Sequence, residues 1–106
     1  MIRHLLFITF TEAASAEQVD AVRRAFLDMP RRVTGVIRVE WGMNDSPEGK
    51  NAGYTHCVLM TFTGEAARRR YLPHPAHAAL KTMLSPLLRE IIVLDFTLTP
   101  ENSTAV

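Results

Sequence analysis

Two closely spaced prolines restrict the backbone in the segment 71–77, which reads Tyr-Leu-Pro-His-Pro-Ala-His. Proline fixes its own φ at about −65° and disfavours a helical conformation in the residue before it. A helix is therefore expected to end before Pro73, with Leu72 and His74 extended. Proline also suits the first position of a helix, so a new helix is predicted to begin at Pro75.

Two side chains that can handle protons flank this corner, with Tyr71 ending one helix and His77 in the first turn of the next. A stiff corner can hold them within the tolerance that acid–base chemistry needs. The structural alternative is that the histidines satisfy turn groups and the Tyr71 ring only packs on the sheet. A metal site at His74 and His77 has weak support, because no cysteine or acidic residue lies near them in sequence.

Composition bounds the class of protein. The chain has 106 residues, of which 47% are hydrophobic and 22% charged, and this predicts one domain over 1–99 with a flexible tail over 100–106. The single cysteine, Cys57, suits a reducing cytoplasm. A net charge of +1 with mixed signs gives no electrostatic signal for nucleic acid or membrane. The first apolar run is too short for a signal peptide, and no segment is long enough to span a bilayer.

The hydrophobic pattern predicts a regular alternation of elements. Strands are expected over 2–10, 35–43, 54–62 and 91–98, and helices over 15–29, 64–72 and from 75 onward. Ser15 and Gln18 match a capping box at the start of the first helix, and Pro30 is expected to end it. Pro86 should interrupt the last helix. In the second strand, the apolar face is expected to carry the alternate residues Ile37, Val39, Trp41 and Met43.

This order, βαββαβ, predicts an α+β ferredoxin-like fold with a four-stranded antiparallel sheet and helices on one face. The first and last strands, however, are apolar on both faces. The face without helices therefore needs another partner, and a homodimer through this open sheet face is expected, giving a dimeric α/β-barrel.

Other polar residues carry weaker signals. His4 shares a strand face with Leu6 and Ile8, so it is either a buried, hydrogen-bonded histidine, which is the favoured interpretation, or a pocket residue. His56, in the third strand, is a weaker candidate. The arginine run 68–70 is interpreted as a solvated face, because consecutive residues fan around a helix.

Five motifs together resemble the stress-responsive dimeric α/β-barrel (Dabb) family over nearly the whole chain. They are Ile2-Arg3-His4, Trp41-Gly42, Gly53-Tyr54-Thr55-His56, Tyr71 with His74-Pro75-Ala76-His77, and Asp95-Phe96. The resemblance implies ferredoxin-like protomers that pair into a barrel. One characterised member is a cofactor-free cyclase that closes a linear polyketide by aldol condensation. The resemblance gives His77 and Tyr71 the acid–base roles of that cyclase and places His4 in the same pocket.

The residues themselves fit a cofactor-free mechanism at neutral pH. His77 can take a proton α to a carbonyl, and Tyr71 can donate a hydrogen bond to the developing oxyanion. The expected ligand is a small apolar carbonyl or phenolic compound, and the expected activity is that of a cyclase or lyase. Oxygen-dependent oxidation of a phenol, as by a monooxygenase, is an alternative by fold analogy. A noncatalytic dimeric stress or ligand-binding protein is the alternative from a different class.

Overall fold

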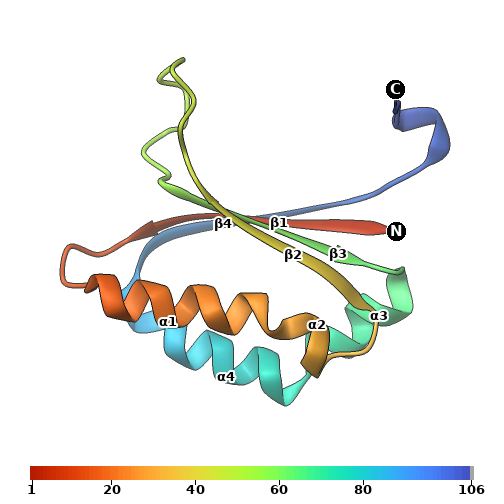
Figure 1. The fold of residues 1–106 in the computed structure, drawn as a ribbon, viewed down its shortest axis with the longest axis horizontal. Helices are drawn as coiled ribbons and strands as arrows, with labels where there is room; N and C mark the ends of the chain where they lie inside the picture. The colour runs from red at the N-terminus through yellow and green to blue at the C-terminus, as the bar shows by residue number, and fades with distance from the viewer. Residues whose placement is uncertain (106) are drawn as a thin grey trace.

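Four strands form one antiparallel sheet in the computed structural model, which describes residues 1–105. In chain order the main elements are β1 (Ile2–Phe10), α1 (Ala16–Leu27), α2 (Met29–Arg32), β2 (Val36–Met43), β3 (His56–Phe62), α3 (Glu65–Tyr71), α4 (Pro75–Leu84) and β4 (Leu88–Thr97). The strand order is β2-β3-β1-β4, and the helices lie on one side of the sheet (Figure 1). The predicted ferredoxin-like βαββαβ fold is confirmed.

Two single 3-10 turns complete the described elements. The first, Ser85–Leu87, follows α4 directly and contains Pro86, so the expected interruption of the last helix is confirmed. The second, Pro100–Asn102, lies in the segment that was expected to be a flexible tail, whose last residue, Val106, lies outside the described residues. Within residues 1–105, none of the helices combines the length and the apolar character that crossing a bilayer requires.

The core lies between the helices and the face of the sheet that they cover. Alternate residues of β1 and β3 point to this face because side chains alternate along a strand. Those that are almost fully buried include Ile2, Ile8, Val58, Met60 and Phe62. From the helices, the buried apolar side chains are Val22, Phe26, Met29, Ala67, Tyr71, Leu80 and Leu84. Tyr71 is thus part of the core as well as a site candidate.

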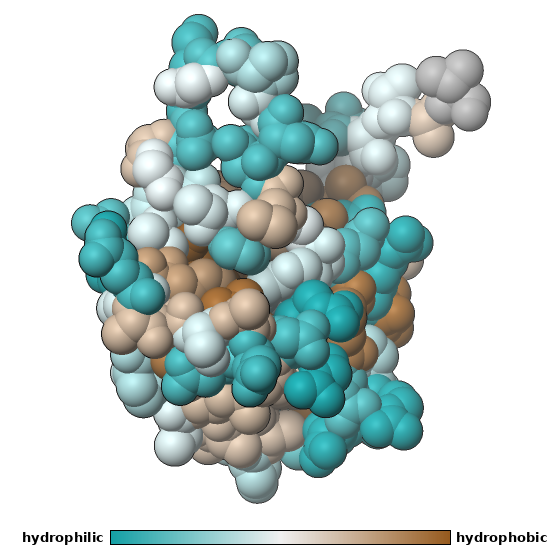
Figure 2. Space-filling view, turned by 60° about the vertical axis from the view of Figure 1, so that its left-hand side comes forward, coloured by the Kyte–Doolittle hydropathy of each residue, from teal (hydrophilic) through white to brown (hydrophobic). Residues whose placement is uncertain are grey.

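The opposite face of the sheet is apolar and uncovered. In the strand register, Leu5 lies between Leu59 and Leu94, and Phe7 lies between Cys57 and Ile92. On β4, Ile92 is 44% exposed and Leu94 is 58% exposed. The β2–β3 loop and the C-terminal segment project to this side of the sheet (Figure 1), and the loop is a hydrophilic projection at the top of Figure 2. The prediction that β1 and β4 are apolar on both faces is therefore confirmed.

The proline corner differs from its prediction at one residue. Leu72 has helical dihedrals, φ −57° and ψ −43°, and its N–H donates to the Arg68 carbonyl, so the expectation that Leu72 is extended is wrong. The residue before proline is biased against the helical region but not barred from it, and here the bond to Arg68 completes the last turn. His74 is extended and α4 begins at Pro75, as predicted.

The first helix ends earlier than predicted. The capping box of Ser15 and Gln18 is present, but α1 stops at Leu27 and Pro30 does not end it. Pro30 instead lies in the first turn of the short α2, where a missing N–H costs nothing. The chain turns at Asp28, which forms ion pairs with Arg31 and Arg32. These ion pairs hold the side chains of both arginines beside the turn.

Strand β2 contains an irregularity that changes which side chains face the core. The pairing with β3 shifts between Val36 and Arg38, so strict alternation fails there. Val36 is buried while Ile37 is 48% exposed, and Val39 and Trp41 then pack against the core. The expected apolar face is thus correct for Val39 and Trp41 but wrong for Ile37 and for Met43, which is 68% exposed.

Helix α3 packs unusually close to the start of β2, at Gly35. This glycine has a φ of +94°, and a Cβ atom built on it would lie 2.4 Å from the Cβ of Ala67. A left-handed backbone conformation favours glycine, and here the lack of a side chain also makes room for the helix. The close approach fixes α3, and with it the position of Tyr71 at its end.

Candidate active site

The rings of Tyr71 and His77 pack against each other across the proline corner. Their centroids are 4.3 Å apart with an interplanar angle of 33°. Tyr71 is only 1% exposed, and His77 is partly buried. The Nδ1 atom of His77 lies 2.9 Å from the Leu72 carbonyl oxygen. Because a carbonyl oxygen only accepts, Nδ1 carries the hydrogen of the neutral ring, and the lone pair is left on Nε2.

The surroundings keep both groups in the protonation states that acid–base chemistry requires. Burial lowers the pKa of His77, a shift that the bond to Leu72 opposes and that the charges of Lys81 and His4 reinforce. Burial also raises the pKa of the Tyr71 hydroxyl above its usual value, with no hydrogen bond from residues 1–105 contributing. At neutral pH, His77 is therefore a neutral base and Tyr71 a protonated donor.

His4 also contacts Tyr71, from the inner strand β1 of the sheet. Its ring centroid is 6.1 Å from that of Tyr71, with the two rings edge to face. His4 is 6% exposed and opposes Asp95 in the register of β1 with β4. The His4 Nδ1 atom lies 2.6 Å from Oδ1 of Asp95. The three predicted residues thus form one cluster in which Tyr71 contacts both histidines, and His4 is the buried, hydrogen-bonded histidine that the sequence favoured.

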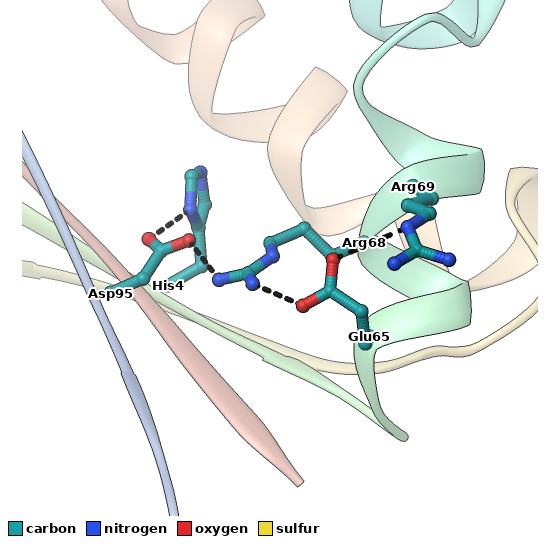
Figure 3. Close-up of polar contacts among 5 residues, drawn as sticks. All are labelled: His4, Glu65, Arg68, Arg69 and Asp95. Atoms are coloured by element: carbon teal, nitrogen blue, oxygen red, sulfur yellow. Dashed lines mark hydrogen bonds and ion pairs between the residues drawn. The ribbon is translucent and has the colours of Figure 1, made fainter.

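A chain of charged groups continues from Asp95 (Figure 3). Its second oxygen, Oδ2, accepts a hydrogen bond of 3.1 Å from Nη1 of Arg68, and Nη2 of Arg68 donates to Glu65. Figure 3 shows the Asp95 carboxylate between the His4 ring and the guanidinium of Arg68, with His4 and Asp95 on neighbouring strands and Arg68 on α3. The chain is therefore continuous from β1 through β4 to the first turn of α3.

The interpretation of residues 68–70 as a solvated face is wrong for Arg68. Its side chain is 26% exposed, whereas that of Arg69 is 78% exposed, and Arg70 turns away to the Thr34 carbonyl. Arg68 precedes Tyr71 by three residues and so shares its helix face, which is directed at the sheet. This spacing was the signal that identifies Arg68. In the sequence, Asp95 is marked only by the family motif Asp95-Phe96.

The two remaining histidines lie outside the cluster. His74 caps α4, because its Nδ1 accepts from the Ala76 N–H at 3.0 Å, and this is the turn-satisfying role left open from the sequence. His56 contacts Phe10 and Trp41, and burial lowers its pKa. Over residues 1–105, no three His, Cys, Asp or Glu side chains come together in a way that would hold a metal ion.

Two surface hollows lie elsewhere on the molecule. One, of about 660 Å³, is a groove between α1 and α4 that includes Ala25 and Ala79 in its walls. The other, of about 450 Å³, lies beneath the β2–β3 loop and includes Phe7 and Cys57. Neither is lined by His4, Tyr71 or His77. A ligand held in either hollow would therefore not contact the cluster.

The fold and the buried His–Tyr–His cluster define a ferredoxin-like α+β protein with a candidate acid–base centre. The family model of the Stress responsive A/B Barrel Domain (Dabb) matches residues 2–98, and the chain belongs to this family. The predicted family is thereby confirmed, on a match that spans every strand and all of the cluster.

Curated relatives and solved structures agree with this assignment. The chain is 26% identical over 95 residues to the stress-response A/B barrel domain-containing protein HS1 of Arabidopsis thaliana, covering 90% of this chain and 87% of HS1. It is 23% identical over 96 residues to olivetolic acid cyclase of Cannabis sativa, covering 91% and 95%.

Two solved structures show the same fold at 21% and 24% sequence identity. Hydroxynitrile lyase from Passiflora edulis superimposes with a TM-score of 0.87 at 21% identity, covering 93% of this chain and 94% of the lyase. A dimeric ferredoxin-like protein from Jannaschia sp. CCS1 gives a TM-score of 0.82 at 24% identity, covering 92% and 98%.

Proposed function

We propose that this protein is a cofactor-independent enzyme that uses His77 and Tyr71 in acid–base chemistry on a small carbonyl or phenolic substrate. The observation that carries the proposal is the packing of the His77 ring against the Tyr71 ring, with Nδ1 of His77 engaged by the Leu72 carbonyl so that Nε2 carries the free lone pair. Both groups are fixed by the stiff corner between α3 and α4. Their relative placement costs no reorganisation when a substrate binds.

In the proposed reaction, His77 and Tyr71 act on neighbouring atoms of the substrate. Nε2 of His77 takes a proton from the carbon α to a carbonyl, and the C–H electron pair moves to the carbonyl oxygen as an enolate. The Tyr71 hydroxyl donates a hydrogen bond to this oxygen, where negative charge develops. Return of the proton from His77 completes the cycle without any cofactor.

His4, which also contacts Tyr71, is proposed to orient the substrate. Its Nδ1 is engaged by Asp95, so the Nε2 edge of the ring is the one free to contact a ligand. The carboxylate of Asp95 fixes the ring orientation, as a hydrogen-bonded carboxylate commonly does for a functional histidine. In this arrangement His4 and Asp95 act as positioning residues.

Two relatives support the reaction class. One is a cyclase, and the other is a lyase that acts on a hydroxynitrile. Cleaving a hydroxynitrile removes the hydroxyl proton and breaks the carbon–carbon bond to the nitrile, so that a carbonyl forms and cyanide leaves, while an aldol cyclisation forms a carbon–carbon bond to a carbonyl. Both reactions transfer a proton beside a carbonyl carbon, which is the chemistry that a neutral histidine and a protonated tyrosine can supply.

We also propose that two copies pair through the open sheet face. Leu5, Phe7 and Leu59 form an apolar surface there, which continues onto the exposed side chains of β4. A contiguous apolar surface of this kind marks an interaction site in a soluble protein. The Jannaschia structure with the same fold is described as dimeric.

The proposed activity can be tested without knowing the natural substrate. The wild-type protein is incubated in D₂O with a panel of aryl methyl ketones, and NMR follows exchange of the α-hydrogens. Cleavage of aromatic hydroxynitriles is measured in parallel. We expect acceleration above the buffer rate for at least one class. Tight binding of these compounds with no exchange and no cleavage would instead favour the noncatalytic ligand-binding alternative.

The pH dependence of that activity is expected to report His77. The base must be neutral, so activity falls as the pH drops and His77 takes up a proton. Because burial lowers the pKa of His77 from 6.5, half of the limiting kcat/KM should be lost only below pH 6.5. A profile of kcat/KM from about pH 4.5 to 9 measures this. A midpoint above 6.5 would contradict the assignment of His77 as the base.

A further inference from the structure

We propose that Arg68 is a positioning residue of the candidate site, acting through Asp95 on the orientation of His4. The effect on catalysis rests on the proposed function, whereas the contacts of Arg68, Asp95 and His4 do not depend on it. Asp95 has two carboxylate oxygens, and each has a separate partner: Oδ1 binds His4 and Oδ2 binds Arg68. Arg68 thus fixes the rotation of the carboxylate that holds the histidine ring.

The first step of the argument is that Asp95 needs this second partner. Asp95 lies on β4, one of the two edge strands of the sheet, and its side chain is 23% exposed. A carboxylate held at one oxygen on an edge strand can rotate and exchange its partner for water. A second charge-assisted bond at the other oxygen removes this freedom. The bond of 3.1 Å from Arg68 is the one that the structure provides.

The second step is that Arg68 is itself held at both ends. Its Nη1 donates to Asp95, and its Nη2 donates to Glu65, one turn earlier on α3. The planar guanidinium is thereby anchored between two carboxylates that come from different elements. A lysine has a single flexible ammonium group and can replace the charge but not the two-sided fork.

The third step concerns the His4 ring, which is aligned by the two bonds of Asp95 to His4 and Arg68, here called the clamp. His4 is enclosed by Phe62 and Tyr71, and the charged or titratable groups around it come from three elements: Asp95 on β4, Arg68 on α3, which in turn binds Glu65, and His77 on α4. With Nδ1–H directed at Asp95, the free Nε2 is held on the other edge of the ring. Release of Asp95 would free the ring to exchange tautomers, and the oriented Nε2 would be lost.

The test compares Arg68→Gln with Arg69→Gln, a matched change one residue away in the same arginine run. Arg69 is 78% exposed and makes only a long contact of 3.7 Å with Glu65. NMR of protein labelled with ¹⁵N-histidine records the His4 Nδ1–H proton, which is shifted downfield by its short bond to Asp95. We expect this resonance in the wild type and in Arg69→Gln, and its loss by exchange broadening in Arg68→Gln.

Further variants keep the test decisive. Arg68→Lys should recover the resonance in part, and Glu65→Gln, which frees the far end of the guanidinium, should weaken it. Arg68→Lys and Glu65→Gln still test the proposal if Arg68→Gln does not fold. An unchanged resonance in Arg68→Gln, or in both Arg68→Lys and Glu65→Gln, would overturn the role of Arg68.

Activity separates this inference from the proposed function. Where the wild type turns over, kcat should fall about tenfold in Arg68→Gln with KM little changed, which corresponds to the loss of one charge-assisted hydrogen bond. If the wild type shows no turnover but the resonance is lost as expected, the proposed function fails while the clamp is supported. If turnover is present and the resonance is unchanged, the clamp fails alone.

Discussion

Replacing His77 with glutamine is expected to lower turnover by about 10²- to 10⁴-fold, the range for removing a positioned general base. The glutamine amide can still donate to the Leu72 carbonyl, which is the bond that His77 makes to the corner. Only the basic Nε2 lone pair is then lost. The thermal midpoint should therefore stay within a few degrees of the wild type, and steady-state kinetics should show the loss mainly in kcat.

His74 offers a matched control in the same motif. Its side chain caps α4, and asparagine is among the residues preferred at a helix N-cap. His74→Asn should therefore keep both the helix and the activity. Equal losses in the two variants, or full activity in His77→Gln, would show that the histidines serve the corner rather than the chemistry.

Leu94→Lys is expected to convert the proposed dimer to a monomer. Leu94 is 58% exposed on the open face, where it lies beside Leu5 of β1. A lysine there would have to bury an unpaired charge in an apolar interface, at a cost of several kcal/mol. The dimer dissociation constant should rise on the order of a thousandfold. Sedimentation velocity across a concentration series measures this directly.

Val93 provides the control for the choice of face. It is 53% exposed on the same strand, but alternation directs it to the opposite side of the sheet from Leu94. Val93→Lys should leave the dimer intact. Dissociation caused by Val93→Lys and not by Leu94→Lys would place the interface on the other side of β4.

The elements of this fold are predictable because local rules determine them. The capping box starts α1, the two prolines place the corner, and alternating side chains mark the strands. The errors lie where a specific backbone contact, local for Leu72 and between strands for Ile37, overrides the general preference of the residue. Leu72 stays helical because its N–H reaches Arg68, and Ile37 is exposed because β2 shifts its pairing with β3.

The candidate site can be predicted only in part from the sequence. Tyr71 and His77 are close in the chain, so their pairing across the corner follows from local geometry. The contact of His4 with Asp95 joins residues at opposite ends of the chain and depends on the register of β1 with β4. Sequence pattern alone does not specify that register, although the three-residue spacing of Arg68 from Tyr71 does indicate which arginine of the run 68–70 turns toward the sheet.

The most direct test of the acid–base centre is a crystal structure with a bound para-substituted acetophenone, a non-cyclising carbonyl compound. We expect the ketone oxygen within hydrogen-bond distance of the Tyr71 hydroxyl. The methyl carbon should lie at about 3 to 3.5 Å from Nε2 of His77. The ketone bound only in the groove between α1 and α4, or beneath the β2–β3 loop, would contradict the account, because neither hollow reaches these groups.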